Sequence, residues 1–157
     1  MTLRHTFSSP DATATFALAL SKVIKAGDVI LLQGPIGAGK THFARSLIQA
    51  RLAAAGRHED VPSPTFTLVQ TYEDGDSEIW HADLYRLTHP DEVDELGLID
   101  AFETAICLVE WPDRLGDLTP DNAVTLNLTS TDRPGERNLI ATGPARWMTL
   151  LKDALNA

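Results

Sequence analysis

Cysteine, lysine and long apolar runs are all scarce in this sequence. The 157 residues include one cysteine, Cys107, so the chain can form no internal disulfide and no zinc site built on several cysteines. No apolar run approaches the ~18 residues that a membrane-spanning helix needs. The first seven residues, MTLRHTF, lack the apolar core of a signal peptide. We therefore expect a cytoplasmic protein that does not contact membranes.

Positive charge is also scarce. The chain has 13 Lys and Arg against 22 Asp and Glu, a formal net charge of −9. Only four of the basic residues are lysines: Lys22, Lys25, Lys40 and Lys152. A surface that follows nucleic acid or an anionic membrane needs clustered positive charge, so strong direct binding to nucleic acid is not expected.

The composition is that of an ordinary globular domain. The chain is 43% hydrophobic and 22% charged, and no repeat or Pro/Ser-rich linker divides it. At ~150 residues per domain, this length predicts a single domain spanning residues 1–157.

Hydrophobic periodicity predicts strands that alternate with helices. Helices are expected over residues 10–25, from about 43 to 56, over 91–102 and over 145–155. Strands are expected over residues 28–33, 67–72, 78–84, 106–109, 123–128 and 138–141, and residues 57–66 are expected to form a loop. The strands at 67–72 and 78–84 are joined by the short turn DGDS and predict an antiparallel hairpin. The apolar strands between helices predict an α/β fold with a covered, mostly parallel central sheet.

A glycine-rich loop follows the first predicted strand. The segment GPIGAGKT, residues 34–41, fits the phosphate-binding pattern GxxxxGK[ST] completely. Gly37 and Gly39 accept backbone angles that a Cβ would obstruct, so amide groups can converge on phosphate oxygens. Lys40 is placed to reach the β- and γ-phosphates, and Thr41 to coordinate Mg²⁺. The loop predicts a nucleotide site in a P-loop NTPase-like three-layer sandwich.

Two acidic residues are candidates for serving the metal or the attacking water. Glu110 directly follows the apolar strand at 106–109, where strand-end ligands of nucleotide sites occur. Asp83 is the second candidate, and its alternative is a surface acid paired with Arg86.

The sequence favours ATP over GTP, because the guanine-specificity pattern NKxD is absent. A small-metabolite kinase remains an alternative, although such enzymes usually have a basic lid. The arginines that could form one are scattered: Arg45, Arg51, Arg57 and Arg86. A non-catalytic nucleotide-binding regulator is a further alternative.

Four sequence blocks together closely resemble the TsaE family, bacterial ATPases of tRNA threonylcarbamoyladenosine biosynthesis. The blocks occur in the family's order and span nearly the whole chain: GAGKT at 37–41, SPTFTLV at 63–69, HADLYR at 81–86 and LVEWPDR at 108–114. The resemblance implies an ATPase that works with the partners TsaD and TsaB. These partners transfer threonylcarbamoyl to adenosine 37 of tRNA, and ATP binding and hydrolysis reset the complex between turnovers.

The resemblance also implies roles for individual residues. Lys40 binds phosphate, Thr41 binds Mg²⁺, and Asp83 and Glu110 serve the metal or the attacking water. Thr65 lies in a switch-like loop that faces the γ-phosphate. The nucleotide pocket is completed by residues that the resemblance places around it: Ser9, Pro10, Gly37, Ala38, Gly39, His42, Trp111 and Arg137.

The chain departs from the family pattern within the loop, where Pro35-Ile36 replaces an acid and a leucine and His42 replaces a hydroxyl residue. His42 either touches an α-phosphate or covers the start of the helix. Thr65 has the alternative of capping a strand. Trp111 either stacks on a base or partner or packs in the protein. His81 is expected to be a histidine on the sheet face, with a ligand role as its alternative.

Overall fold

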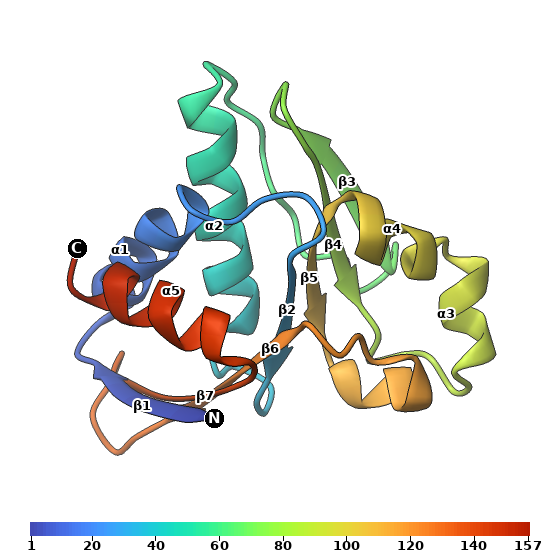
Figure 1. Cartoon of the computed structure of the whole chain (residues 1–157). Helices are drawn as coiled ribbons and strands as arrows, with labels where there is room; N and C mark the ends of the chain where they lie inside the picture. Colours follow the sequence, from blue (N-terminus) through green and yellow to red (C-terminus); the bar gives the residue numbers. More distant parts are fainter.

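The computed structural model describes all 157 residues and contains one seven-stranded sheet with helices on both faces (Figure 1). Its strands are β1 (Thr2–Phe7), β2 (Val29–Gln33), β3 (Val69–Glu73), β4 (Glu78–Asp83), β5 (Ile106–Glu110), β6 (Val124–Ser130) and β7 (Arg137–Thr142). Its helices are α1 (Pro10–Ser21), α2 (Lys40–Ala54), α3 (Asp91–Glu95), α4 (Leu98–Thr104), the 3₁₀ helix η1 (Pro112–Leu118) and α5 (Ala145–Leu155).

The sheet has a parallel core with antiparallel strands at both edges. Its order is β1-β7-β6-β2-β5-β4-β3. Strand β2 pairs in parallel with β5 and β6, and β4 pairs in parallel with β5. The predicted α/β fold and its antiparallel hairpin, β3–β4, are confirmed. The sequence did not predict that the other edge, built from β6, β7 and β1, is antiparallel as well.

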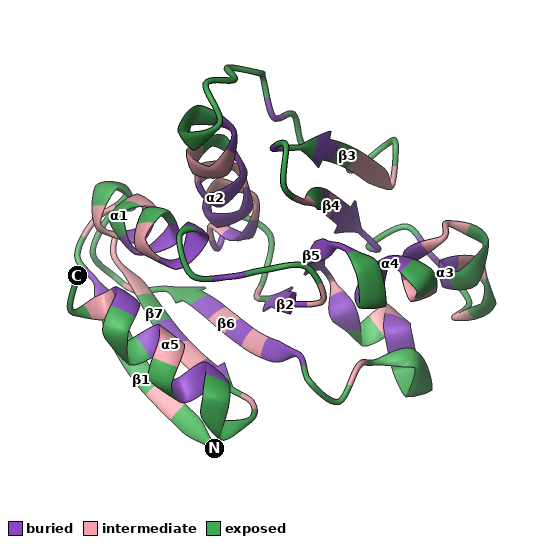
Figure 2. Cartoon of the chain, turned by 45° about the horizontal axis from the view of Figure 1, so that its top comes forward, coloured by how far each residue is buried: buried purple, intermediate pink, exposed green.

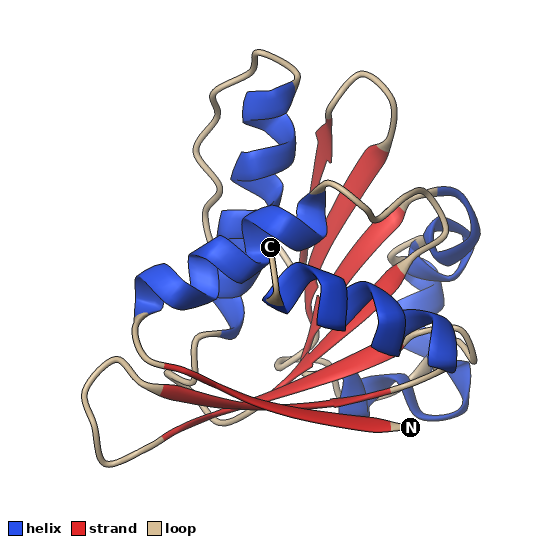
Figure 3. Cartoon of the chain, turned by 60° about the vertical axis from the view of Figure 1, so that its left-hand side comes forward, coloured by secondary structure: helices blue, strands red, loops and turns tan.

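Helices cover the sheet in two separate groups, which gives the predicted three layers. Helices α1, α2 and α5 lie on one face, and α3, α4 and η1 lie on the other (Figures 1 and 3). None of these helices is long and apolar enough to span a bilayer.

Strand alternation explains why both faces are covered. Along β2, Ile30 and Leu32 belong to the core beneath α1, α2 and α5, whereas Val29 and Leu31 belong to the core beneath α3 and α4. All four side chains are buried, and burial continues along the central strands (Figure 2). A strand that is apolar on both faces is stable only between two layers.

Three of the parallel strands bring polar, potentially catalytic residues to the same end of the sheet, the one at which these strands finish. The glycine-rich loop follows β2, Asp83 ends β4, and Glu110 ends β5. Glu110 is the register neighbour of Leu32 on one side and of Asp83 on the other. Because the carboxyl ends of parallel strands lie at the same end of the sheet, the loop and both acids converge there.

Several predicted elements differ in extent from those in the structure. The helix predicted at 10–25 ends at Ser21, and the one predicted at 91–102 is two short helices. Gly97 separates them because its φ of 82° is left-handed and cannot continue a helix. Strand β1 and helix η1 were not predicted.

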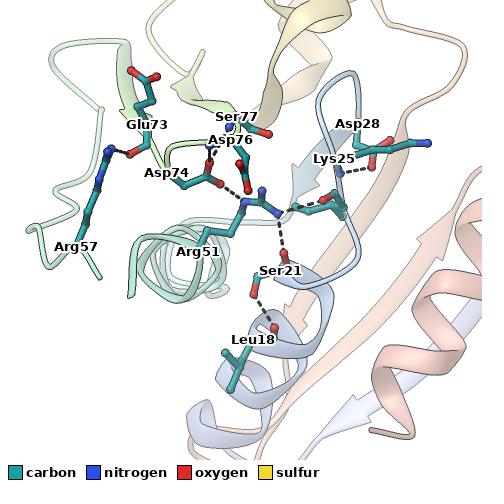
Figure 4. A network of polar contacts seen from close by, with 11 residues as sticks. Leu18, Ser21, Lys25, Asp28, Arg51, Arg57, Glu73, Asp74, Asp76 and Ser77 are labelled. Carbon is teal, nitrogen blue, oxygen red and sulfur yellow. Dashed lines mark hydrogen bonds and ion pairs between the residues drawn. The ribbon is translucent and has the colours of Figure 1, made fainter. Parts of the chain in front are cut away.

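Arg51 of α2 joins three parts of the structure (Figure 4). Its Nε donates to Oδ2 of Asp74 at 2.6 Å, and its Nη1 donates to the carbonyls of Ser21 and Ile24. Asp74 lies in the β3–β4 turn and also accepts from the amides of Asp76 and Ser77. The guanidinium therefore ties the hairpin to α2 and to the end of α1.

Candidate nucleotide-binding site

The loop between β2 and α2 has the conformation that its glycines predict. Gly37 and Gly39 have φ values of 83° and 102°, which L side chains rarely adopt. Gly39 is the N-cap of α2, and no side chain caps the helix start. The first amides of an α-helix have no partner within the helix and carry partial positive charge, so this start is suited to an anion.

A cavity of about 570 Å³ opens beside the loop, within the size range of small-molecule sites. It is lined by Pro10, Thr13, Ile36, Gly37, Ala38, Gly39, Lys40, Thr41, His42, Thr65, Asp83, Tyr85, Glu110, Trp111, Gly135 and Arg137. Every predicted site residue except Ser9 is among them. The structure therefore brings together residues that lie more than a hundred positions apart in the sequence.

Thr41 and Glu110 are in direct contact within the cavity. The hydroxyl of Thr41 donates to Glu110, with its Oγ1 2.8 Å from Oε1 and 3.0 Å from Oε2. Glu110 is only 2% exposed. A hydroxyl that donates its proton keeps two lone pairs free, so this contact leaves Thr41 able to coordinate a cation.

Asp83 and Thr65 form a second pair in the cavity wall. The hydroxyl of Thr65 donates to Oδ2 of Asp83 at 3.2 Å, and the amide of Tyr85 donates to Oδ1 at 3.0 Å. Asp83 is 4% exposed, so it is not the surface acid of the alternative interpretation. Arg86, the expected partner in that alternative, donates to the carbonyl of Phe66 instead.

Lys40 is buried against the loop and against Trp111. Its Nζ donates to the carbonyls of Gly34 and Pro35, and lies 3.7 Å from the centroid of a Trp111 ring. Burial lowers the pKa of Lys40, while the nearby carboxylates of Glu110 and Asp83 act to raise it. Trp111 itself has a left-handed φ of 58° and packs against Tyr85, with ring centroids 4.9 Å apart.

The remaining predicted residues lie on the α1 side of the cavity. Arg137, the first residue of β7, donates to the carbonyls of Ala38 and Gly37. The Nε2 of His42 lies 3.0 Å from the carbonyl oxygen of Pro10. Ser9 lies beside the cavity without lining it, because its Oγ accepts from the amide of Ala12 and caps α1.

The sequence did not indicate three lining residues, Thr13, Tyr85 and Gly135, whereas a fourth, Ile36, lies within the predicted loop but was assigned no role. Thr13 lies one turn after Pro10 on α1, and Tyr85 lies two residues after Asp83, so their motif neighbours could have indicated them. Gly135 gave no such signal. A Cβ at this position would lie 3.0 Å from Cδ of Pro10, which shows how closely the two segments approach.

His81 contacts a site residue although it does not itself line the cavity. It lies on the face of the sheet, as expected, and is fully buried. Its Nε2 lies 2.7 Å from Oε2 of Glu110. The histidine therefore contacts a candidate metal-serving acid.

The polar groups of the cavity suit a phosphate ester with a hard cation. Thr41, Asp83 and Glu110 offer oxygen donors, as Mg²⁺ prefers. No three His, Cys, Asp or Glu side chains are arranged to hold a metal by themselves. Because Mg²⁺ is usually bound through one or two carboxylates together with substrate phosphates, this sparse arrangement fits Mg²⁺ that arrives with a nucleotide.

Comparisons with known proteins agree on one family. A family model described as "Threonylcarbamoyl adenosine biosynthesis protein TsaE" matches residues 7–139. The chain is 38% identical to the tRNA threonylcarbamoyladenosine biosynthesis protein TsaE of Rickettsia conorii over 128 residues, which is 82% of this chain and 71% of that protein. It is 34% identical to the TsaE protein of Bacillus subtilis over 119 residues, covering 75% of this chain and 72% of that one.

A solved structure supports the same relationship. The crystal structure of Bacillus subtilis YdiB superposes with a TM-score of 0.76 at 26% identity, covering 99% of this chain and 95% of that one. Because it covers 99% of this chain, the superposition extends beyond residues 7–139, which the family model matches.

Proposed function

The chain belongs to the TsaE family of threonylcarbamoyl adenosine biosynthesis proteins, and from that premise we propose that it is an Mg²⁺-dependent ATPase serving tRNA threonylcarbamoylation. The observation that carries the proposal is the contact between Thr41 and the buried Glu110 at the uncapped start of α2. A buried carboxylate beside a phosphate site repels phosphate unless a cation lies between them. The arrangement thus supports a metal–nucleotide complex over a bare anion.

The phosphate groups of ATP are held by the loop and by Lys40. The first amides of α2 donate to phosphate oxygens. Lys40 donates to the carbonyls of Gly34 and Pro35, and when ATP binds it donates to the phosphate oxygens instead. Arg137 keeps the loop carbonyls of Gly37 and Ala38 turned away from the phosphates by donating to them. The residues at the α1 side of the cavity then remain for the nucleoside.

The two threonine–acid pairs, Thr41 with Glu110 and Thr65 with Asp83, have different roles in hydrolysis. Mg²⁺ bound with ATP supplies positive charge that offsets the charge on the transferred phosphoryl group. Thr41 would coordinate the metal, and Glu110, which accepts from the Thr41 hydroxyl, would hold that hydroxyl in place and serve the metal. Asp83 and Thr65 face the same space and orient the attacking water. This division is supported by the contacts of Thr41 with Glu110 and of Thr65 with Asp83.

None of the four arginines named as a possible kinase lid lines the cavity, and Arg86 donates to the carbonyl of Phe66. Arg45 donates to the carbonyl of Val61, Arg51 pairs with Asp74, and Arg57 donates to the carbonyl of Glu73. No basic segment lies over the nucleotide site. The kinase alternative therefore gains no support.

The protein acts together with the TsaD–TsaB complex and leaves tRNA binding to those partners. Its formal net charge of −9 disfavours a phosphate-tracking surface of its own. ATP hydrolysis resets the complex after each transfer, so the protein hydrolyses ATP slowly alone and faster with the partners.

The decisive experiment is multiple-turnover tRNA modification reconstituted with TsaD and TsaB. We expect many rounds with the wild-type protein, and about one round per complex without it or with Glu110→Gln. Glu110→Gln should also lower partner-activated ATP hydrolysis about 100- to 1,000-fold, the usual effect of removing one such electrostatic contact.

Glu103→Gln is the matched control, because it makes the same chemical change at an exposed residue outside the cavity. It should behave as wild type in both assays. Repeated turnover without this protein, together with ATPase activity that the partners leave unchanged, would contradict the proposal. Transfer of the γ-phosphate to a metabolite would support the kinase alternative.

A further inference from the structure

His81 is a fully buried, chemistry-bearing residue to which the proposed hydrolysis gives no task. It lies in β4, and its ring is 0% exposed. Strand alternation places His81 and Asp83 on the same face of the sheet, together with Ile79 of the core beneath α2. His81 is therefore aimed at the layer that contains the start of α2.

The register of β4 and β5 determines which residue the imidazole meets. His81 is opposite Leu108, and Glu110 lies two residues further along β5 on the same face. Such a diagonal neighbour is within reach of a long side chain. The two groups do meet, with His81 Nε2 2.7 Å from Glu110 Oε2.

The contact defines which ring nitrogen carries a proton. A carboxylate oxygen only accepts, so Nε2 of His81 is the donor. The other nitrogen, Nδ1, is buried and has no hydrogen-bond partner. An apolar side chain would fill the same place without leaving a buried polar atom unpaired, and an unpaired buried polar atom lowers the stability of the fold. The polar contact that the imidazole makes here is the one to Glu110.

Glu110 needs this second donor to keep one orientation. The terminal torsion of a glutamate side chain is broad, and Thr41 offers one proton that lies close to both carboxylate oxygens. Donation from Thr41 alone leaves the carboxylate free to rotate. Donation from His81 to Oε2 fixes the plane of the group, with Oε1 2.8 Å from the Thr41 hydroxyl.

We propose that His81 is a positioning residue that holds the Glu110 carboxylate in the orientation needed to serve Thr41 and the metal. The inference rests on the proposed function, because it assigns Glu110 to the metal side of the site. His81 itself does not line the cavity, so it acts through Glu110. Its loss should therefore affect the metal-dependent part of ATP use and spare nucleotide binding as such.

The test compares His81→Leu, which removes the donor, with His81→Gln, whose amide nitrogen reaches about as far as Nε2. For His81→Leu we expect kcat to fall about 10- to 100-fold and half-saturation by Mg²⁺ to need about 10-fold more metal, typical of lost support for a metal-serving group. ADP affinity measured in EDTA and KM for ATP should stay within about 2-fold of wild type. His81→Gln should recover most of kcat and of the Mg²⁺ dependence.

Tyr72→Phe is the matched control, because it removes another buried polar atom without a partner, in the neighbouring strand and outside the cavity. It should leave kcat and Mg²⁺ dependence unchanged. If His81→Leu does not fold, His81→Asn replaces it, since its shorter amide cannot reach Glu110, and the same losses are expected.

Two results would overturn the inference. One is a folded His81→Leu with wild-type kcat and Mg²⁺ dependence. The other is a loss of ADP affinity in EDTA that matches the loss of kcat, which would show a merely structural role. Glu110→Gln separates this inference from the proposed function. If Glu110→Gln loses activity while His81→Leu does not, only the role of His81 fails; if Glu110→Gln keeps full activity, the proposed function fails.

Discussion

Gly34 directly follows β2 and is the first residue of the phosphate loop. A Cβ built at this glycine would lie 2.2 Å from the carbonyl oxygen of Leu128 in β6, and the residue has a φ of 140°. Real Cβ atoms do not approach backbone oxygens so closely. The neighbouring atom belongs to a strand of the sheet, so it cannot move aside as a flexible side chain would.

Gly34→Ala should therefore destabilise the protein severely. We expect the free energy of unfolding to fall by about 3–5 kcal/mol, from the clash and the backbone strain together. Urea denaturation followed by circular dichroism measures this change. Gly56→Ala is the control, because Gly56 also has a positive φ, 75°, but a Cβ there would meet no atom within 4 Å. It should lower the free energy of unfolding by only about 1 kcal/mol. Equal losses for the two variants would refute the argument from the close approach.

Motifs indicated most of the site residues because each motif is local in the sequence. The loop at 34–41 and Glu110 after an apolar strand could be identified without knowing what lies next to them. His81 could have been recognised as a neighbour of the site, since a residue two before Asp83 on a strand shares its face. Gly135 could not, because it reaches the cavity only through the folding of β6 and β7 against α1.

At the scale of elements, the hairpin β3–β4 depends on its turn being held against α2. Burial opposes the charged form of Asp74, but the amides of Ser77 and Asp76 and the guanidinium of Arg51 outweigh it, so the pKa of Asp74 lies below its usual value. The side chains of Arg51 and Asp74 are 14% and 5% exposed, so water screens their pairing weakly.

Asp74→Asn should lower the free energy of unfolding at pH 7 by about 2–3 kcal/mol, because Arg51 then loses a buried charged partner. The folded pKa of Asp74 is depressed, so its contribution is fully present above its unfolded pKa of ~3.9. It is lost as the pH falls through the lower folded pKa. Urea denaturation at pH 7 and near pH 2.5 should therefore show the difference between wild type and variant shrinking in acid.

Asp113→Asn is the control for this prediction, because Asp113 pairs with Arg114 where both side chains are exposed. It should change stability by about 0.5 kcal/mol or less at either pH. If Asp74→Asn lowered the free energy of unfolding no more than Asp113→Asn does, the buried pair would not hold the hairpin. The same would follow if the loss for Asp74→Asn were as large near pH 2.5 as at pH 7.

Elements were predicted where the apolar pattern was strong and missed where it was weak. Strands β2 and β5 are short apolar runs, and both were placed to within about one residue. In β1 only Phe7 is buried, so the strand has no alternating pattern and is held by its pairing with β7. The continuous helix expected at 91–102 ignored Gly97, where the left-handed turn overrides the local helical preference.

At the scale of the whole molecule, the cavity joins segments from almost the full length of the chain. Pro10 and Thr13 come from the first helix, Thr65 and Asp83 from the middle, and Arg137 from the last strand. A ligand that fills the cavity contacts all of these segments at once. Local opening of any one of them would release the ligand, so binding should stabilise the entire fold and not only the loop.

ATP with Mg²⁺ should therefore raise the melting temperature of the whole domain in one cooperative transition. At a free concentration of 100 times Kd, the added stability is ~2.7 kcal/mol, which for a domain of this size corresponds to a shift of about 5–10 °C. Differential scanning calorimetry measures both the shift and the cooperativity. Lys40→Ala should show no shift at the same ATP concentration, because in the proposed function Lys40 binds the phosphate oxygens. Two separate transitions, with only one raised by ATP, would show instead that the distant segments are not joined through the cavity.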